Sequence, residues 1–154
     1  MTEQMTPSAV ESSESAPASA AAVTELRVEG DIVFQRSVGN TSLADTKRLY
    51  EMCCAVYERY GYALVLIDST RGGMASPEAR RYQTDMLRKQ IFPSHTAVYG
   101  GGLLSRTGVI LMMRASELVT GTKIPVDLVA DEASARKLLD VARQRFRAEG
   151  IAKR

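Results

Sequence analysis

The residues best placed for chemistry gather around Asp68, which ends the apolar run YALVLID at residues 62–68. Runs of this kind form strands that are buried on both faces of a sheet, and α/β proteins place ligands beyond the carboxyl ends of such strands. The Asp68 carboxylate there could bind a cation or orient a ligand. It could instead satisfy backbone N–H groups of the following turn, and this interpretation is favoured. Ser69 and Thr70 follow as hydroxyls that a kinase could modify.

Ser76 stands before Pro77 and Glu78. A capping hydroxyl, a proline at the first helical position and an acid in the first turn together predict the start of a helix. A phosphoserine at this point would be stabilised by the helix dipole and the free amides, and Arg80 follows within one turn. Capping alone accounts for the serine, so a phosphorylation switch is the alternative hypothesis.

A run of three glycines precedes the next candidate site. Gly101 lies at its centre and Arg106 follows shortly after, so exposed backbone amides there could hold a phosphate. The run lacks the spacing of known phosphate-binding loops, and a flexible strand-to-helix connection is favoured. His95 is the only histidine, and the preceding residues 93–94 indicate a loop. With no visible partner for His95, neither a metal site nor a catalytic group is predicted.

The most unusual segment is the expected helix at residues 103–121. Five consecutive apolar residues cover every face of it: Val109, Ile110, Leu111, Met112 and Met113. Such a helix is either buried, under the N-terminal segment or a homodimer mate, or exposed as a contact for a partner or a lipid. The flanking Arg106 and Arg114 could meet lipid phosphates, which makes peripheral membrane contact a further expectation.

The elements that must position these residues follow from periodicity and from turn and capping signals. In chain order they are strands at 25–30 and 32–38, a helix at 42–60, a strand at 62–68, a glycine-containing loop, a helix from 77, a strand at 96–99, a helix at 104–119, a strand at 124–129 and a helix after Asp131. Strands that alternate with helices predict an α/β fold. We expect a mixed sheet of about five strands with an N-terminal β-hairpin and about four helices packed on it.

Composition fits one domain of ordinary size. The chain has 154 residues, of which 45% are apolar and 25% charged. Residues 1–23 form a Ser/Ala/Glu-rich tail that we expect to be disordered, the domain spans 24–150, and 151–154 form a basic end. The net charge of +2 is too weakly concentrated for a nucleic-acid partner. No segment predicts a transmembrane helix, and the adjacent Cys53 and Cys54 suggest no disulfide framework, so cytoplasmic residence is expected.

The element order resembles the STAS domain superfamily in its SpoIIAA-like branch, which is related to CRAL-TRIO lipid-binding domains. The resemblance covers residues 24–148 and rests on the opening hairpin that leads into residues 39–42, the YALVLIDST run, the helix start at 76–80, and IPVDLVADEASARKLL. In STAS proteins that antagonise anti-sigma factors, a serine at the helix start after the third strand is the phosphorylated switch. Ser76 lies near that position, although Pro77 follows it where the family's motif has glycine.

Two functions follow from these residues and this resemblance. The first is a non-enzymatic regulatory module that binds a protein partner through the carboxyl edge of the sheet and the 103–121 helix. The alternative is a carrier or sensor of a lipid or another apolar small molecule, with the same helix acting as a gate. No cofactor and no metal is predicted, because no paired carboxylates, Cys–His pair or ligand cluster stands at a recognisable spacing.

Overall fold

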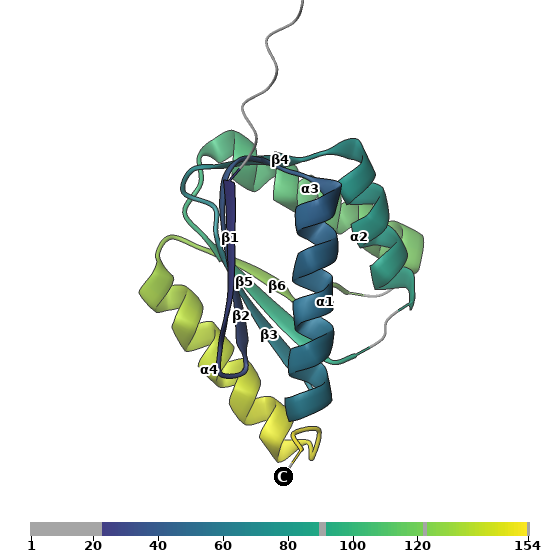
Figure 1. Ribbon diagram of the computed structural model, residues 1–154, viewed down its shortest axis with the longest axis vertical. Coiled ribbons are helices and arrows are strands. Elements are labelled where there is room, and N and C mark those ends of the chain that lie inside the picture. The colour runs from purple at the N-terminus through teal and green to yellow at the C-terminus, as the bar shows by residue number, and fades with distance from the viewer. Residues whose placement is uncertain (1–22, 90–91, 122, 154) are drawn as a thin grey trace, which may run out of the picture.

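Strands and helices alternate along the chain, as the pattern of the sequence predicts. The computed structural model describes residues 23–89, 92–121 and 123–153 (Figure 1). Its elements are β1 (Val23–Glu29), β2 (Ile32–Thr41), α1 (Leu43–Tyr60), β3 (Ala63–Asp68), β4 (Gly72–Ala75), α2 (Pro77–Lys89), β5 (Ser94–Tyr99), α3 (Leu103–Thr120), β6 (Val126–Val129) and α4 (Glu132–Ala148).

The strands form one mixed sheet in the order β1-β2-β3-β5-β6. The hairpin strand β1 runs antiparallel to β2, and the remaining neighbours are parallel. The predicted α/β fold, with its N-terminal hairpin and four helices, is therefore confirmed. The predicted loop after β3 is wrong in one respect, because Gly72–Ala75 forms the short strand β4 beside the carboxyl end of β2. A four-residue Gly-Gly-Met-Ala strand has no alternation of its own, so only pairing with β2 reveals it.

The two faces of the sheet are covered by different helices. In Figure 1, α4 lies on one side of the strands, and α1 and α2 lie on the other. The α4 face holds a core of buried residues: Ile32, Phe34, Tyr62, Leu64, Leu66, Ala97, Tyr99, Ala135, Leu139, Ala142 and Phe146. Side chains alternate along a strand, so the residues between these belong to the opposite face. There a second cluster packs under α1: Val33, Cys53, Val56, Ala63 and Val65.

Local signals set the ends of the helices. Ser42 and Asp45 form the predicted capping box at the start of α1, and Gly61 ends that helix with φ of 83°. Asp131 caps α4 by accepting a hydrogen bond from the backbone N–H of Ser134 at 2.8 Å. These caps satisfy backbone groups that a helix leaves unpaired at its ends. They place α1 and α4 against the sheet as the sequence predicts.

Several boundaries differ from expectation, and β2 continues to Thr41 while β6 begins only at Val126. Ser94 and His95 belong to β5 and not to a loop, since they pair with Ala63 and Leu64 of β3. The preceding proline indicated a break, but a proline can stand before the first residue of a strand. Val23, assigned to the tail, begins β1, and the rest of that predicted tail lies outside the described residues. Residues 151–153 continue onto the domain, where the backbone N–H of Lys153 donates to the Tyr60 carbonyl at 2.8 Å.

Candidate functional site

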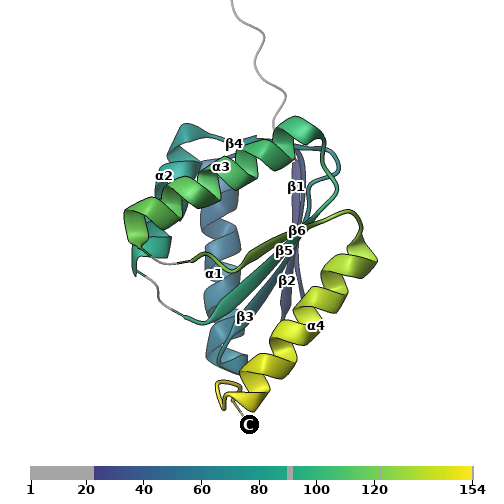
Figure 2. The same ribbon diagram turned by 180° about the vertical axis from the view of Figure 1, so that it is seen from behind.

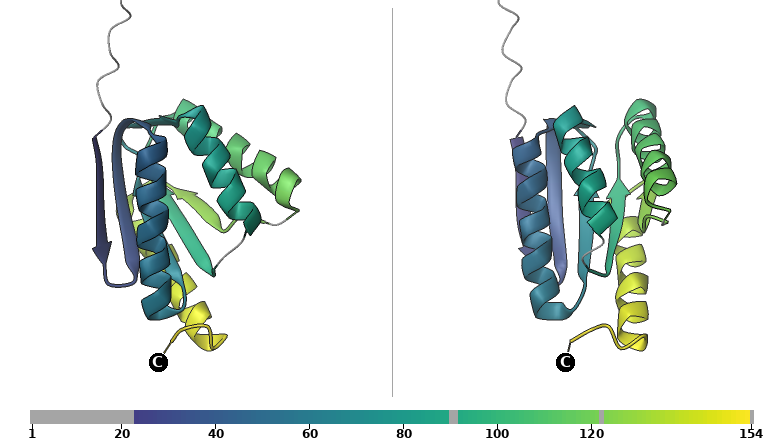
Figure 3. Two further views of the ribbon diagram at one scale, coloured as in Figure 1. Left: turned by 45° about the vertical axis from the view of Figure 1, so that its right-hand side comes forward. Right: turned by 90° about the vertical axis from the view of Figure 1, so that its right-hand side faces the viewer.

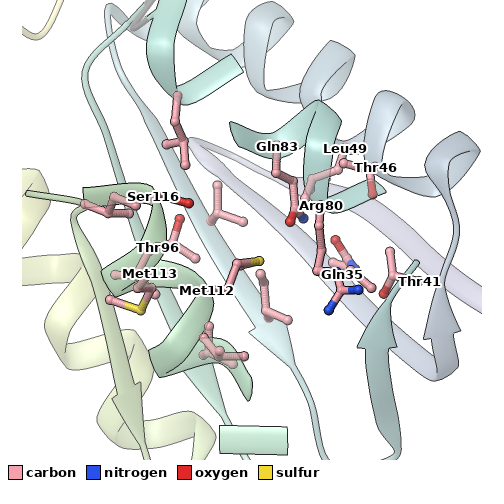
Figure 4. Close-up of a pocket in the computed structure, with 18 of the residues that line it drawn as sticks. Gln35, Thr41, Thr46, Leu49, Arg80, Gln83, Thr96, Met112, Met113 and Ser116 are labelled. Carbon is pink, nitrogen blue, oxygen red and sulfur yellow. The ribbon is translucent and has the colours of Figure 1, made fainter. Parts of the chain in front are cut away.

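A cavity of about 380 Å³ lies between one face of the sheet and the helices α1, α2 and α3 (Figure 4). Protein interiors normally contain few voids larger than a water molecule. An engineered apolar cavity of about 150 Å³ already takes up benzene, and ligand pockets are typically about 300–1,000 Å³. The cavity therefore has the size of a binding site for a small molecule.

The helices cover this face of the sheet unevenly. Near the amino ends of the parallel strands, α1 packs directly on the sheet through the cluster of Cys53 and Val56. At the carboxyl ends, α3 lies across the sheet (Figure 2), and α2 and α3 occupy the same side of it as α1 (Figure 3). The cavity opens where these two helices replace α1 as the cover. This is the end of a parallel sheet at which α/β proteins place ligands.

Apolar side chains form much of the wall. They come from all the covering elements and from the sheet: Leu49, Val65, Ile67, Met86, Phe92, Val98, Val109, Met112 and Met113. Met112 and Met113 point into the cavity from α3, beside Ser116 (Figure 4). Methionine is flexible and polarizable, so such a wall adapts to the shape of an apolar guest.

Two buried polar atoms of the cavity wall have no hydrogen-bond partner among the described residues: Oε1 of Gln35 and Oε1 of Gln83. The Tyr50 hydroxyl lies beside the Cys54 thiol, and burial, and then this thiol, raise the pKa of Tyr50 to about 12. An unsatisfied buried polar group costs about 1–3 kcal/mol. These atoms therefore favour an occupant that can hydrogen-bond with them.

Arg80 is the half-buried cation of the wall. Its side chain points from α2 into the cavity, on the side of Gln35 and Gln83 (Figure 4). Within the described part of the chain, no carboxylate lies within ion-pair distance of its guanidinium. A cation held in this way is available to a ligand.

Asp68, the acidic residue among the described wall residues, is already engaged. Its Oδ1 accepts from the backbone N–H of Thr70 at 3.0 Å, and its Oδ2 accepts from Nε of Arg36 at 2.8 Å. Burial acts to raise the pKa of Asp68, but the hydrogen bonds from Thr70, Arg36 and Tyr99 outweigh burial and lower the pKa to about 2. The carboxylate thus stays charged and compensated, and it stabilises the turn after β3.

A groove between α2 and α3 leads to the cavity from outside. The groove has a volume of about 740 Å³, and it shares five wall residues with the cavity: Met74, Arg80, Gly108, Met112 and Ser116. Gly108 keeps the groove free of a side chain on α3, and a Cβ there would come within 3.6 Å of the Met74 methyl group. The groove and the cavity thus adjoin at these residues, and we infer an entrance there between the two helices.

The helix α3 lies at the surface and is not a core helix. Its inner side faces the cavity, whereas Leu111 is 62% exposed and Leu118 is 87% exposed on the outside. Ile110 is also exposed, as are Arg106 and Arg114. The outer face of this helix is therefore exposed among the described residues, and its use as a contact surface stays a prediction. Nothing in the described residues covers that outer face.

The other predicted residues lie around the rim of the carboxyl end. The Ser76 hydroxyl accepts from the backbone N–H of Ala79 at 3.1 Å, which is capping geometry. Ser69 belongs to the cavity wall, whereas the exposed Thr70 packs against Gly100. Gly101 has φ of 79° in the connection to α3 and is not part of the wall. The structure thus places Asp68, Ser69, Arg80, Met112 and Met113 in the wall of the cavity. Ser76, Thr70 and Gly101 do not belong to that wall.

The sequence analysis missed the polar wall residues of the sheet, namely Gln35, Ser37 and Thr96. One signal was present: in β2 the cavity face reads Val33, Gln35, Ser37, so it changes from apolar to polar toward the carboxyl end. A sheet face that is buried yet polar at one end indicates a ligand site or an internal hydrogen-bond network.

His95 has a partner that sequence analysis did not predict. Its Nε2 lies 2.7 Å from Oδ2 of Asp127 on the neighbouring strand β6. The pair is not part of the cavity wall. Among the described residues, no three His, Cys, Asp or Glu side chains gather to hold a metal ion. The described helices include none that is both long and apolar enough to cross a membrane.

Comparisons with known proteins give a likeness of fold. No protein-family model and no curated protein matches the chain. Among solved structures, the chain is similar to an uncharacterized protein of the DUF3478 family with a SpoIIAA-like fold from Shewanella loihica PV-4. The identity is 16% over 77% of this chain and 93% of that one, with a TM-score of 0.48.

A second similar structure is that of the anti-sigma factor antagonist SpoIIAA in its unphosphorylated form. The identity is 11% over 79% of this chain and 98% of that one, with a TM-score of 0.46. The first of these proteins is described as having a SpoIIAA-like fold, and the second is SpoIIAA itself. Neither likeness assigns a ligand, a partner or a residue role to this chain.

Proposed function

We propose that this chain is a non-enzymatic binding domain that takes up one apolar small molecule in the cavity between the sheet and α1, α2 and α3. The single observation that carries this proposal is the cavity itself, about 380 Å³ with a largely apolar wall. Its entrance between α2 and α3 gives a ligand a path to the interior. The predicted carrier or sensor is thus the function that the geometry supports best.

The energetic cost of an empty cavity supports an occupant. The cavity is partly open to solvent, so without a ligand water enters it and leaves the apolar wall wet. An apolar ligand removes the same wall from water at about 25 cal/mol per Å².

A binding role also fits the polar chemistry of the fold. The His95–Asp127 pair lies outside the cavity, and Asp68 is held by Arg36 and by the turn that follows it. Cys53 lies on the cavity wall, but burial, and then the neighbouring Cys54, raise its pKa to about 12, so it is a poor nucleophile at neutral pH. Both cysteines are free, which suits the cytoplasmic residence that we include in the proposal.

Native mass spectrometry of the full-length protein, purified gently from its own cells, tests the proposal. We expect an added mass at one molecule per chain. A Thr96→Phe variant should lose this mass, because the larger side chain fills the cavity from β5. Thr107→Phe is the matched control, since Thr107 is exposed on α3 outside the cavity wall, and it should keep the ligand.

Two outcomes would contradict the proposal. One is a native protein that carries no added mass and binds no added long-chain alcohol. The other is a ligand that Thr96→Phe and Thr107→Phe retain equally, which would place the bound molecule outside the cavity.

A second candidate, the regulatory interaction module predicted from sequence, is favoured by the exposed outer face of α3. Leu111 and Leu118 belong to this face, together with Arg106 and Arg114. Such a face fits a protein partner, a second copy of the chain or an anionic membrane surface. The homodimer is tested by analytical ultracentrifugation. A dimer that dissociates in Leu111→Asp but persists in Val141→Asp, where the exposed valine lies on α4, would support it. A monomer at all concentrations would exclude it.

A further inference from the structure

The cavity has a polar, cationic side and an apolar side. Gln35, Gln83 and Arg80 point into it from β2 and α2 (Figure 4). The apolar side includes Met112 and Met113 of α3, together with apolar residues of the sheet and of the other covering helices. A cavity divided in this way matches a molecule that has a polar head and an apolar chain.

The polar side lacks the partners that its own atoms require. Gln35 is 5% exposed, and its Nε2 donates to the Ser37 hydroxyl oxygen at 2.8 Å, while its Oε1 has no partner among the described residues. The same holds for Oε1 of Gln83. Buried polar atoms in native proteins are normally hydrogen-bonded, and an exception at a cavity wall indicates a missing ligand or water.

The charge balance of the cavity wall is positive. Asp68 is neutralised by Arg36, which is not itself part of the wall. Arg80 and Lys123 remain as the cations of the described wall residues, and neither has a carboxylate within ion-pair distance in the described part of the chain. Lys123 is exposed to solvent, whereas Arg80 is half-buried beside the unpaired amides. A partly desolvated guanidinium attracts an anion more strongly than an exposed ammonium group does.

We propose that the ligand is a single-chain amphiphile with a carboxylate head, and that Arg80 binds that head while the chain lies under α3. This inference rests on the proposed function and adds the chemical class of the ligand. Gln35 and Gln83 complete the head site with their side-chain amides turned over: each Nε2 then donates to the carboxylate, and Oε1 of Gln35 accepts from the Ser37 hydroxyl.

A carboxylate fits this side better than a phosphate. A guanidinium forms two parallel hydrogen bonds with one carboxylate, and one cation balances one negative charge. A phosphate monoester carries close to two negative charges at neutral pH and would need a second cation at the head. The side chains labelled around Arg80 in Figure 4 are uncharged, and the polar ones are Gln35, Gln83, Thr41 and Thr46.

Calorimetric titration of the full-length protein with dodecanoate, dodecanol and dodecyl phosphate tests the proposal. These probes share the same chain and differ in the head. We expect dodecanoate to bind about 10- to 100-fold more tightly than dodecanol, which is the range of a charge-assisted hydrogen-bonded contact. In Arg80→Met the two should bind within about twofold of each other, because methionine keeps the apolar stem and the helix propensity but removes the charge.

Two control variants locate the effect. Arg81 belongs to the outer groove but not to the cavity, and Lys123 is the exposed cation of the wall. Arg81→Met and Lys123→Met should both keep the preference for dodecanoate. Arg80→Lys should retain part of it, since it keeps the charge and loses the bidentate geometry. Thermal unfolding of each variant shows that the protein remains folded.

The outcomes separate the head site from the proposed function. Equal affinity of the native protein for dodecanol and dodecanoate would overturn the carboxylate assignment and leave the cavity function standing. Tighter binding of dodecyl phosphate than of dodecanoate would overturn the assignment in favour of a phosphate head. A preference lost in Lys123→Met but kept in Arg80→Met would move the head away from Arg80. Binding of none of the three probes would overturn both proposals.

Discussion

Replacement of Arg143 by methionine should strongly destabilise the domain, because Arg143 joins α4 to the hairpin turn. Its Nε and Nη2 donate to the two carboxylate oxygens of Asp31 at 2.7 and 2.8 Å. The Tyr62 hydroxyl donates to the same carboxylate at 2.6 Å. The Arg143 and Asp31 side chains are only 20% and 11% exposed. In Arg143→Met, the carboxylate stays buried with Tyr62 as its remaining side-chain partner.

The magnitude follows from the burial of the pair. Removing one partner of a buried ion pair costs about 3–5 kcal/mol, and removing one partner of an exposed pair costs about 1 kcal/mol or less. Because this pair is mostly but not fully buried, we expect a loss of about 3 kcal/mol for Arg143→Met. The double variant Asp31→Asn/Arg143→Met should lose less than the two single losses added together, because it leaves no unpaired charge.

Urea unfolding at pH 7 followed by circular dichroism measures these losses. Lys137→Met, an exposed change on the same helix, is the control and should alter stability by less than about 0.5 kcal/mol. A loss below about 1 kcal/mol for Arg143→Met, or additive losses in the double variant, would show that the pair does not stabilise the domain as a buried ion pair.

The same pair predicts a dependence on pH. Burial acts to raise the pKa of Asp31, but the hydrogen bonds from Arg143 and Tyr62 outweigh burial and hold the pKa below its ordinary value of 3.8. The stabilisation is therefore fully present above about pH 4. It is lost as the pH falls through the lowered pKa of the folded state. Asp31→Asn should remove this part of the acid sensitivity.

Three further predictions concern stability elsewhere in the fold. Hydrogen bonds lower the pKa of Asp68 to about 2, so Asp68→Asn should cost about 2 kcal/mol of stability at pH 7 and progressively less between pH 4 and pH 2. Urea titrations that show a constant cost across that range would contradict this. Gly61→Ala should lower the unfolding temperature more than Gly121→Ala does. Both glycines have positive φ, but only at Gly61 would a Cβ meet another atom, the Ile151 carbonyl oxygen. Equal losses would show that this clash is absent. Ser76→Ala should lose about 1 kcal/mol of stability through the lost cap of α2, and an unchanged midpoint in urea would show that the cap contributes nothing.

Local signals in the sequence predicted the elements well. The Gly30-Asp31 turn, the capping box of Ser42 and Asp45, and the glycine after α1 each involve residues within four positions of one another. Each of these signals depends only on residues that are close together in the sequence, so it can be recognised before the fold is known. The alternation of strands and helices then restricted the architecture to a mainly parallel sheet with helices on its faces.

Contacts between distant segments could not be predicted in this way. The strand β4 exists because its backbone pairs with β2, more than 30 residues earlier, and its own sequence contains little more than two glycines and a methionine. The His95–Asp127 contact likewise joins residues 32 positions apart on neighbouring strands. Their register depends on β5 and β6 being neighbours in the sheet, which the sequence of either strand alone does not specify.

The candidate site was predicted only in part. The apolar run in α3 predicted either a buried helix or a contact surface, and the structure shows Met112 and Met113 over a cavity with Leu111 exposed outside. The head side could not be foreseen, because Gln35 and Arg80 come from different elements and become neighbours of one cavity only when α2 packs over the sheet. Neither residue is unusual in its own element.

A crystal structure of the protein with 12-bromododecanoate would show where the ligand binds, because anomalous scattering locates the bromine at the end of the chain. We expect one bromine peak inside the cavity, between α3 and the sheet near Met112 and Thr96, with the carboxylate at Arg80. A bromine peak only on the exposed face of α3 or only in the outer groove, with the cavity filled by water, would contradict this expectation.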